Sequence, residues 1–143
     1  MHVAKILEFK GRSVETIDIG ASVLDVTRRL SDKRIGAVVV LDAHRDIVGI
    51  VSERDLVRAL AQHAGAALGL SAGDVMSADV VTCRESDTID ELMHTMTARR
   101  IRHLPVVEGG QLVGIVSIGD VVKHHTAEVE FEATAMRDYI AHA

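Results

Sequence analysis

Two Ser-x-x-Asp motifs are the part of this sequence best suited to chemistry. Ser52 and Asp55 form the first motif, Ser117 and Asp120 the second, and each directly follows Gly-Ile-Val. At the start of a helix, such a serine accepts a hydrogen bond from the third helical N–H and the acidic side chain accepts one in return, which is a capping box. The same groups suit a nucleoside phosphate, because free N–H groups and a hydroxyl bind phosphate and a carboxylate binds ribose hydroxyls. Both interpretations are open at this point.

The two motifs differ in the basic side chains that precede them. Arg100, Arg102 and His103 precede the second motif, whereas the first half has Gly36 and Ala37 in place of the last two. These cations could bind a phosphate, or they could form a solvated face that balances the acidic excess. If they bind a phosphate, the two motifs should differ in affinity for the same ligand. The inner motif positions differ as well, with Glu53 and Arg54 in the first and Ile118 and Gly119 in the second.

The sequence lacks the patterns of an enzyme or a metal site. Neither motif serine has a histidine in register in both halves, and no glycine-rich loop ends in Lys-Ser/Thr. The eight histidines do not have the spacing of known metal sites. Cys83, the single cysteine, ends an apolar Val-Val-Thr-Cys stretch and is interpreted as a buried, inert thiol. We therefore expect no catalysis, no metal and no required cofactor.

Length and charge narrow the class of protein further. A chain of 143 residues fits one compact domain. No apolar run approaches the roughly twenty residues of a membrane span, and no basic segment with an apolar core begins the chain, so we expect a cytoplasmic protein without a membrane partner. A net charge of −5 with few aromatic residues argues against nucleic acid as a partner.

The motifs belong to an internal repeat. Sliding the chain by 66 residues superposes Val14 on Val80 and Arg34 on Arg100, and after a shorter turn an offset of 65 superposes Asp55 on Asp120. In each copy the hydrophobic period changes from extended to helical, then to two extended runs, then to helical again. Each copy is thus predicted to be strand, helix, strand, strand, helix.

The elements that must position the first motif are predicted from this pattern. Strands over 14–17, 37–41 and 47–51 accompany a helix that begins near residue 23 and a helix from 53 to about 63, whose apolar face holds Leu56, Val57 and Leu60. Two such units are expected to pack sheet to sheet about a pseudo-twofold axis, which gives a mixed α/β (α+β) fold with two related clefts. The expected segments are an N-terminal capping helix over the first repeat (1–13), the first repeat (14–64), a linker with a short helix (65–79), the second repeat (80–125) and a C-terminal helix (126–143).

Residues 14–123 resemble the tandem cystathionine-β-synthase (CBS) repeats of regulatory proteins. In that family the aspartate of the motif binds ribose, the hydroxyl residue lies near the phosphate, and the first strand and first hairpin strand enclose the base. Carried over to this sequence, the resemblance implies an adenine-nucleotide site formed by Thr16, Ile17, Asp18, Ala37, Val38, Val39, Ser52, Arg54, Asp55, Thr82, Arg102, His103, Leu104, Pro105, Ser117, Gly119 and Asp120.

The resemblance implies a regulatory module rather than an enzyme. Its ligand would be an adenine nucleotide, with AMP or NAD(H) favoured because a single basic cluster neutralises few phosphates, and with ADP, ATP and S-adenosylmethionine as alternatives. The regulated protein is unknown. The competing hypothesis is a structural interaction module without a ligand, in which the motifs only cap helices.

Two further features carry expectations about packing. Pro105, the single proline, cannot donate to a strand ladder and therefore predicts an edge position or a bulge. Beyond residue 123, Val129, Ala133, Met136 and Ile140 form one apolar helical stripe. This stripe must be covered, either by folding back on the N-terminal helix with Val3, Ile6 and Leu7 or by a homodimer, and the CBS resemblance favours the homodimer.

Overall fold

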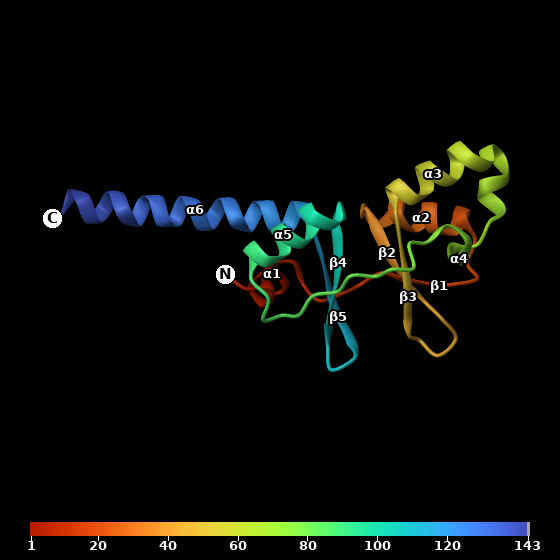
Figure 1. Ribbon diagram of the computed structural model, residues 1–143, viewed down its shortest axis with the longest axis horizontal. Coiled ribbons are helices and arrows are strands. Elements are labelled where there is room, and N and C mark those ends of the chain that lie inside the picture. The colour runs from red at the N-terminus through yellow and green to blue at the C-terminus, as the bar shows by residue number, and fades with distance from the viewer. Residues whose placement is uncertain (143) are drawn as a thin grey trace. The chain divides into compact units, whose positions relative to one another are not determined.

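The computed structural model describes residues 1–142. These residues form two compact units (Figure 1). The first unit comprises residues 14–81, and the second comprises residues 1–13 together with residue 82 onwards. Each unit holds one copy of the predicted repeat, so the repeat and the mixed α/β class are confirmed, while the mutual packing of the two sheets stays a prediction.

The first unit is built on a three-stranded sheet. Strand β1 (Thr16–Asp18) runs parallel to β2 (Ala37–Leu41), which pairs antiparallel with β3 (Ile47–Ser52). All five residues of β2 are buried, because it is the central strand and packs against the apolar side of helix α2 (Val23–Lys33). Helix α3 (Glu53–His63), a 3-10 turn (Ala64–Gly69) and the short helix α4 (Ala72–Val75) complete the unit.

The buried face of α3 differs from the prediction. The helix has the expected bounds and buries Leu56 and Ala59, but Val57 is 66 % exposed and Leu60 47 % exposed. Asp55 is buried on the same side of the helix, where Ser77 Oγ donates to its carboxylate at 3.1 Å. Asp55, Leu56 and Ala59 thus face inward, and the Val57 side is left outside.

The second unit has one strand fewer than expected. Strands β4 (His103–Glu108) and β5 (Gln111–Ser117) form the hairpin, and helices α1 (Val3–Lys10), α5 (Ile89–Arg99) and α6 (Ile118–Ala141) accompany it. In place of a strand near residues 80–83 there is one isolated parallel bridge between Cys83 and Val106.

Pro105 explains this shortened strand. In the first unit, the N–H of Val39 donates to the carbonyl of Glu15 at 3.2 Å and extends the parallel ladder. Pro105 occupies the corresponding place in β4 and has no N–H, so the ladder ends after the bonds made by Cys83. The expected edge position is therefore confirmed on the side of β4 that faces Cys83. The register shift beside Pro105 has another origin, because the first unit has the same shift without a proline.

Helix α1 was expected to cap the first repeat, but it packs in the second unit. The N–H of Val3 donates to Asp87 O and that of Ala4 to Glu85 O, at 2.9 and 3.0 Å. Leu7 lies directly over Gly114 of β5, where a Cβ would come within 2.7 Å of Leu7 Cδ2. The segment before the first repeat thus covers the second.

Helix α6 is continuous from the second motif to Ala141, so the predicted boundary at residue 126 lies inside one helix. Val121 and His124 are buried, whereas all residues from 129 to 142 are exposed. The apolar stripe therefore does not fold back on Val3, Ile6 and Leu7, which are buried elsewhere in the unit. Within residues 1–142, no helix is both long and apolar enough to cross a membrane.

Candidate functional site

Both Ser-x-x-Asp motifs form capping boxes at the junction of a strand and a helix. In the first, the N–H of Ser52 donates to Asp55 Oδ2 at 2.9 Å and the N–H of Asp55 donates to Ser52 Oγ at 3.4 Å. In the second, the corresponding distances between Ser117 and Asp120 are 2.9 and 3.2 Å. The capping interpretation is thus confirmed. Capping does not exclude a ligand, because a carboxylate can accept about four hydrogen bonds.

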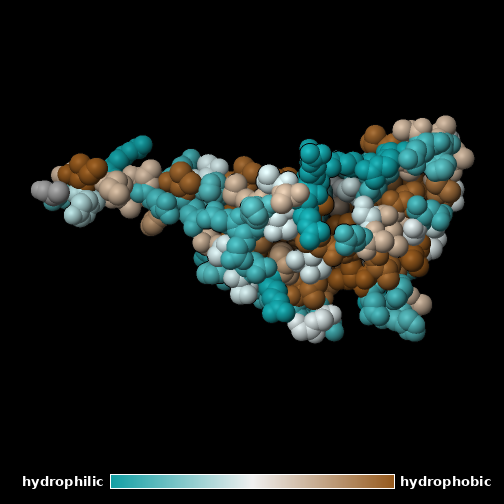
Figure 2. Space-filling model, in the orientation of Figure 1, coloured by the Kyte–Doolittle hydropathy of each residue, from teal (hydrophilic) through white to brown (hydrophobic). Residues whose placement is uncertain are grey.

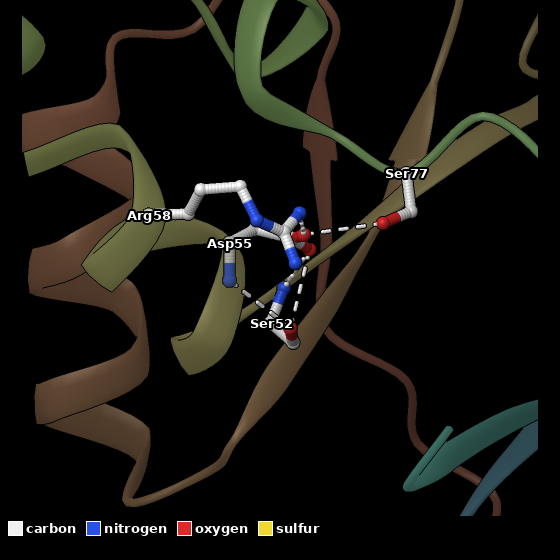
Figure 3. A network of polar contacts seen from close by, with 4 residues as sticks. All are labelled: Ser52, Asp55, Arg58 and Ser77. Atoms are coloured by element: carbon white, nitrogen blue, oxygen red, sulfur yellow. Dashed lines mark hydrogen bonds and ion pairs between the residues drawn. The ribbon is translucent and has the colours of Figure 1, made fainter. Parts of the chain in front are cut away.

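The Asp55 carboxylate is enclosed by its own unit. Oδ1 accepts hydrogen bonds from Ser77 Oγ at 3.1 Å and from the Arg58 guanidinium at 3.4 Å, while Oδ2 accepts from the N–H and the hydroxyl of Ser52. Figure 3 shows Ser77 approaching from the far side and Arg58 lying over the carboxylate from the next turn of α3. The Asp55 side chain is only 5 % exposed. Both oxygens are therefore occupied by protein groups.

The Asp120 carboxylate is more accessible and has a different partner. Its side chain is 24 % exposed, and Lys10 Nζ at the end of α1 donates to Oδ2 at 2.7 Å and to Ile115 O at 2.9 Å. Partial burial acts to raise the pKa of Asp120, but the hydrogen bonds from Lys10 and from the Ser117 backbone outweigh it and lower the pKa below the ordinary 3.8. At neutral pH, Asp120 is an ionised acceptor paired with the Lys10 ammonium.

The partners of the two aspartates come from equivalent places in the chain. Lys10 precedes the first repeat and binds the motif of the second, whereas Ser77 precedes the second repeat and binds the motif of the first. Sequence reasoning did not identify Lys10, Arg58 or Ser77 as site residues. The offset of 66 pairs Lys10 with Met76, next to Ser77, but the offset cannot reveal that each segment contacts the opposite repeat.

The strand register brings several predicted site residues to the motifs. Ala37 lies opposite Ser52 and His103 opposite Ser117, so the first hairpin strand begins beside the motif in each unit. The N–H of Ile118 donates to Arg102 O at 2.8 Å, which places Arg102 at the start of α6. Arg102 is exposed. In the first unit Gly36 makes the same backbone contact and adds no charge.

The remaining predicted residues are only partly brought together. Thr16 pairs with Val39, so β1 and β2 lie side by side. This pairing brings Thr16, Ile17 and Asp18 of β1 next to the strand that holds Val38 and Val39. However, a cavity of about 470 Å³ beside β1 is lined by Thr16, Ile17 and Asp18 with polar residues of α2, and neither motif residue of this unit lines it. Within the second unit, Leu104 and Pro105 are buried and Thr82 is exposed beside Cys83.

Neither metal nor thiol chemistry is supported among the described residues. Residues 1–142 hold no cluster of three histidine, cysteine or acidic side chains suited to a metal. Cys83 is buried, and burial, with smaller contributions from Asp87 and Glu108, raises the pKa of its thiol to about 12. The thiolate is therefore scarce at neutral pH, in agreement with the expected inert thiol.

Comparison with known proteins identifies the family. The CBS domain matches residues 8–62 and 72–126. A CBS-domain containing protein from Agrobacterium tumefaciens is 46 % identical, with a TM-score of 0.83 over 85 % of this chain and 91 % of that chain. A CBS domain protein from Pyrobaculum aerophilum complexed with AMP is 28 % identical, with a TM-score of 0.75 over 84 % and 89 %. The CBS domain pair of protein MJ0100, in complex with 5-methylthioadenosine and S-adenosyl-L-methionine, is 25 % identical, with a TM-score of 0.78 over 90 % and 98 %. This chain therefore belongs to the CBS domain family and carries two copies of the domain.

Proposed function

We propose that this CBS pair is a non-catalytic regulatory module that binds an adenine nucleotide at its second motif. The observation that carries the proposal is the difference between the two aspartates. Asp55 is 5 % exposed with both oxygens bonded to protein groups, whereas Asp120 is 24 % exposed and pairs with Lys10, and the backbone of Arg102 contacts the same helix start. The ligands of the two similar CBS structures, AMP and S-adenosylmethionine with methylthioadenosine, support an adenosine compound.

In this proposal the ribose hydroxyls bind the Asp120 carboxylate and displace Lys10. The released ammonium and Arg102 then neutralise the phosphate, and the N–H of Gly119 at the start of α6 donates to it. Thr82, His103, Leu104, Pro105, Ser117 and Gly119 complete the site. AMP and NAD(H) fit best, because this small number of cations offers little neutralisation for the longer phosphate chain of ATP. ADP, ATP and S-adenosylmethionine are the alternatives to be compared.

The first motif is proposed as a weaker site. A ligand there must replace the hydrogen bonds that Ser77 and Arg58 make to Asp55, and Gly36 and Ala37 supply no positive charge in place of Arg102 and His103. The proposed residues of this site are Thr16, Ile17, Asp18, Ala37, Val38, Val39, Ser52, Arg54 and Asp55.

A structural role without ligand is the competing function. It is favoured by the confirmed capping boxes, which account for both motifs in terms of helix stability alone. Thermal unfolding of the full chain with AMP, NAD(H), ADP, ATP, S-adenosylmethionine and GMP separates the two. We expect AMP or NAD(H) to stabilise the protein by about 2.7 kcal/mol at a hundredfold excess over Kd, and GMP far less. An unchanged melting temperature with every adenine compound at millimolar concentration would leave the structural role.

We also propose a biological setting for this module. The module acts in the cytoplasm as a homodimer and transmits occupancy of its site, as an energy or redox signal, to a regulated protein that the sequence does not name. A ligand transmits a signal only if it binds two arrangements of the module with different affinity. We therefore expect the ligand to change the oligomeric state of the protein. Mass spectrometry of nucleotides that stay bound during native purification identifies the ligand directly.

A further inference from the structure

The C-terminal half of α6 has no tertiary support within the described chain. Residues 129–142 are all exposed, although they include Phe131, Met136, Tyr139 and Ile140. Figure 2 shows apolar residues recurring along this helix. An isolated helix of this length is only marginally stable in water, since its nucleation cost is not repaid by packing. This segment of α6 therefore presents an apolar surface that no described residue covers.

The exposed residues carry a heptad pattern that begins on the folded part of the unit. Val122 is 49 % exposed although its neighbour Val121 is fully buried, and from Val122 the apolar or small residues recur at alternating intervals of four and three. This spacing is that of a two-stranded coiled coil. We define the α6 seam by these residues: Val122, Thr126, Val129, Ala133, Met136 and Ile140.

A different face of α6, about a quarter turn from the seam, is already occupied by its own unit. Val121 and His124 face inward, and the His124 ring lies 5.4 Å from the ring of Phe9 in α1. Val122 and the seam residues from 129 onwards are exposed, so a second helix can approach them without displacing the contacts of α1.

Charges beside the α6 seam select both the partner and its direction. Glu132 and Arg137 flank the seam five residues apart, and neither has an oppositely charged residue three or four positions away on its own helix. In a parallel, in-register pair of α6 helices, Glu132 of each copy meets Arg137 of the other, twice by symmetry. An antiparallel pair that fills the same seam brings the two copies of Glu132 together, and likewise the two copies of Glu130. Only the parallel arrangement is complementary.

We propose that two copies of this chain associate through a parallel, in-register coiled coil formed by the α6 seam, with Glu132 and Arg137 pairing between the copies. This surface deepens the homodimer included in the proposed function, and it does not depend on which nucleotide binds. The interface is isologous, with its two-fold axis along the helix pair.

Site-directed disulfide formation tests the direction and the register. Met136→Cys is expected to give a rapid cross-linked dimer under mild oxidation, because equivalent seam positions face each other in a parallel pair. Phe131→Cys, which is 75 % exposed in the wild type but lies off the seam, is the matched control and should cross-link far more slowly. Cys83 can stay in place, since its buried thiol does not react. Equal cross-linking of the two variants, or cross-linking of Met136→Cys only with a Thr126→Cys chain, overturns the proposal.

Charge reversal with sedimentation of the full-length protein tests the ion pairs. Arg137→Glu should weaken the dimer about tenfold, since two attractive pairs become repulsive, and Glu132→Arg with Arg137→Glu should restore it. A full-length monomer at tens of micromolar overturns both this interface and the homodimer. If Arg137→Glu leaves dimer formation unchanged, the protein is a homodimer but the α6 seam is not its interface. Neither result affects the test of nucleotide binding.

Discussion

Lys10 and Asp120 form an ion pair of 2.7 Å between the end of the N-terminal helix and the second motif. Lys10 also donates to Ile115 O, so one ammonium connects α1 to both the last strand and the last helix of the unit. The helix is held further by an ion pair between Arg12 and Glu85. A ligand that takes Asp120 from Lys10 therefore also alters how the N-terminal helix is anchored.

Alanine at the two aspartates should separate stability from binding. Asp55→Ala is expected to lower the free energy of unfolding by about 2–3 kcal/mol, because it removes a helix cap and leaves the half-buried N–H and hydroxyl of Ser52 without their acceptor. Asp120→Ala removes a more exposed cap and should cost about 1 kcal/mol. Urea unfolding measures both. AMP-dependent stabilisation should persist in Asp55→Ala and disappear in Asp120→Ala, and the reverse result would assign the principal site to the first motif.

The pKa of Asp120 should depend on Lys10. A carboxyl whose pKa is lowered on folding contributes stability above its unfolded value, and this contribution is lost as the pH falls through the folded pKa. The stability difference between wild type and Asp120→Asn should thus be constant from pH 5 to 7 and shrink below about pH 4.

NMR titration of the Asp120 carboxyl carbon checks this directly. The midpoint should lie below 3.8 in the wild type and rise in Lys10→Met. Lys5→Met is the control, because Lys5 pairs with Glu8 on the same helix and does not contact Asp120. A midpoint that Lys10→Met leaves unchanged would show that the Ser117 backbone alone sets the pKa.

Phosphate recognition should reside in the second hairpin. Replacing Arg102 and His103 together with alanine is expected to weaken AMP about tenfold or more while adenosine binding changes little, since charge-assisted hydrogen bonds are lost only with the phosphate. Isothermal titration calorimetry with both ligands gives the ratio. Arg45→Ala in the hairpin turn of the first unit is the control. An equal loss for AMP and adenosine would indicate that the pair supports the fold rather than the phosphate.

Gly114 should be required for the packing of α1. Gly114→Ala places a methyl group within 2.7 Å of Leu7 and should cost about 1–3 kcal/mol as an overpacked contact. The cost should fall when Leu7→Ala is present, so a double-mutant cycle measures the coupling. Gly65→Ala, with no atom near its added methyl group, is the control. Additive effects in the cycle would show that Leu7 does not restrict this position.

The parts that were predictable from the sequence depend on local signals. The repeat, the order of strands and helices, and the bounds of α3 follow from hydrophobic period and from caps, which act over three or four residues. Both capping boxes, and the absence of a backbone N–H donor at Pro105, are local features of this kind. The seventeen predicted site residues were chosen by their place in the repeat, and the strand register does bring Ala37 to Ser52 and His103 to Ser117.

Other features were decided only by tertiary packing. The sequence did not show that α1 covers the second repeat, that Lys10 binds Asp120 across 110 residues, or that Ser77 and Arg58 enclose Asp55. Nor did it show which face of α3 is buried. Val57 and Leu60 follow the helical spacing of a buried apolar face, although both side chains are exposed. Periodicity specifies that a side chain needs cover but not which distant segment supplies it. That choice depends on shape, such as the space that Gly114 leaves for Leu7, and it exists only once the chain is folded.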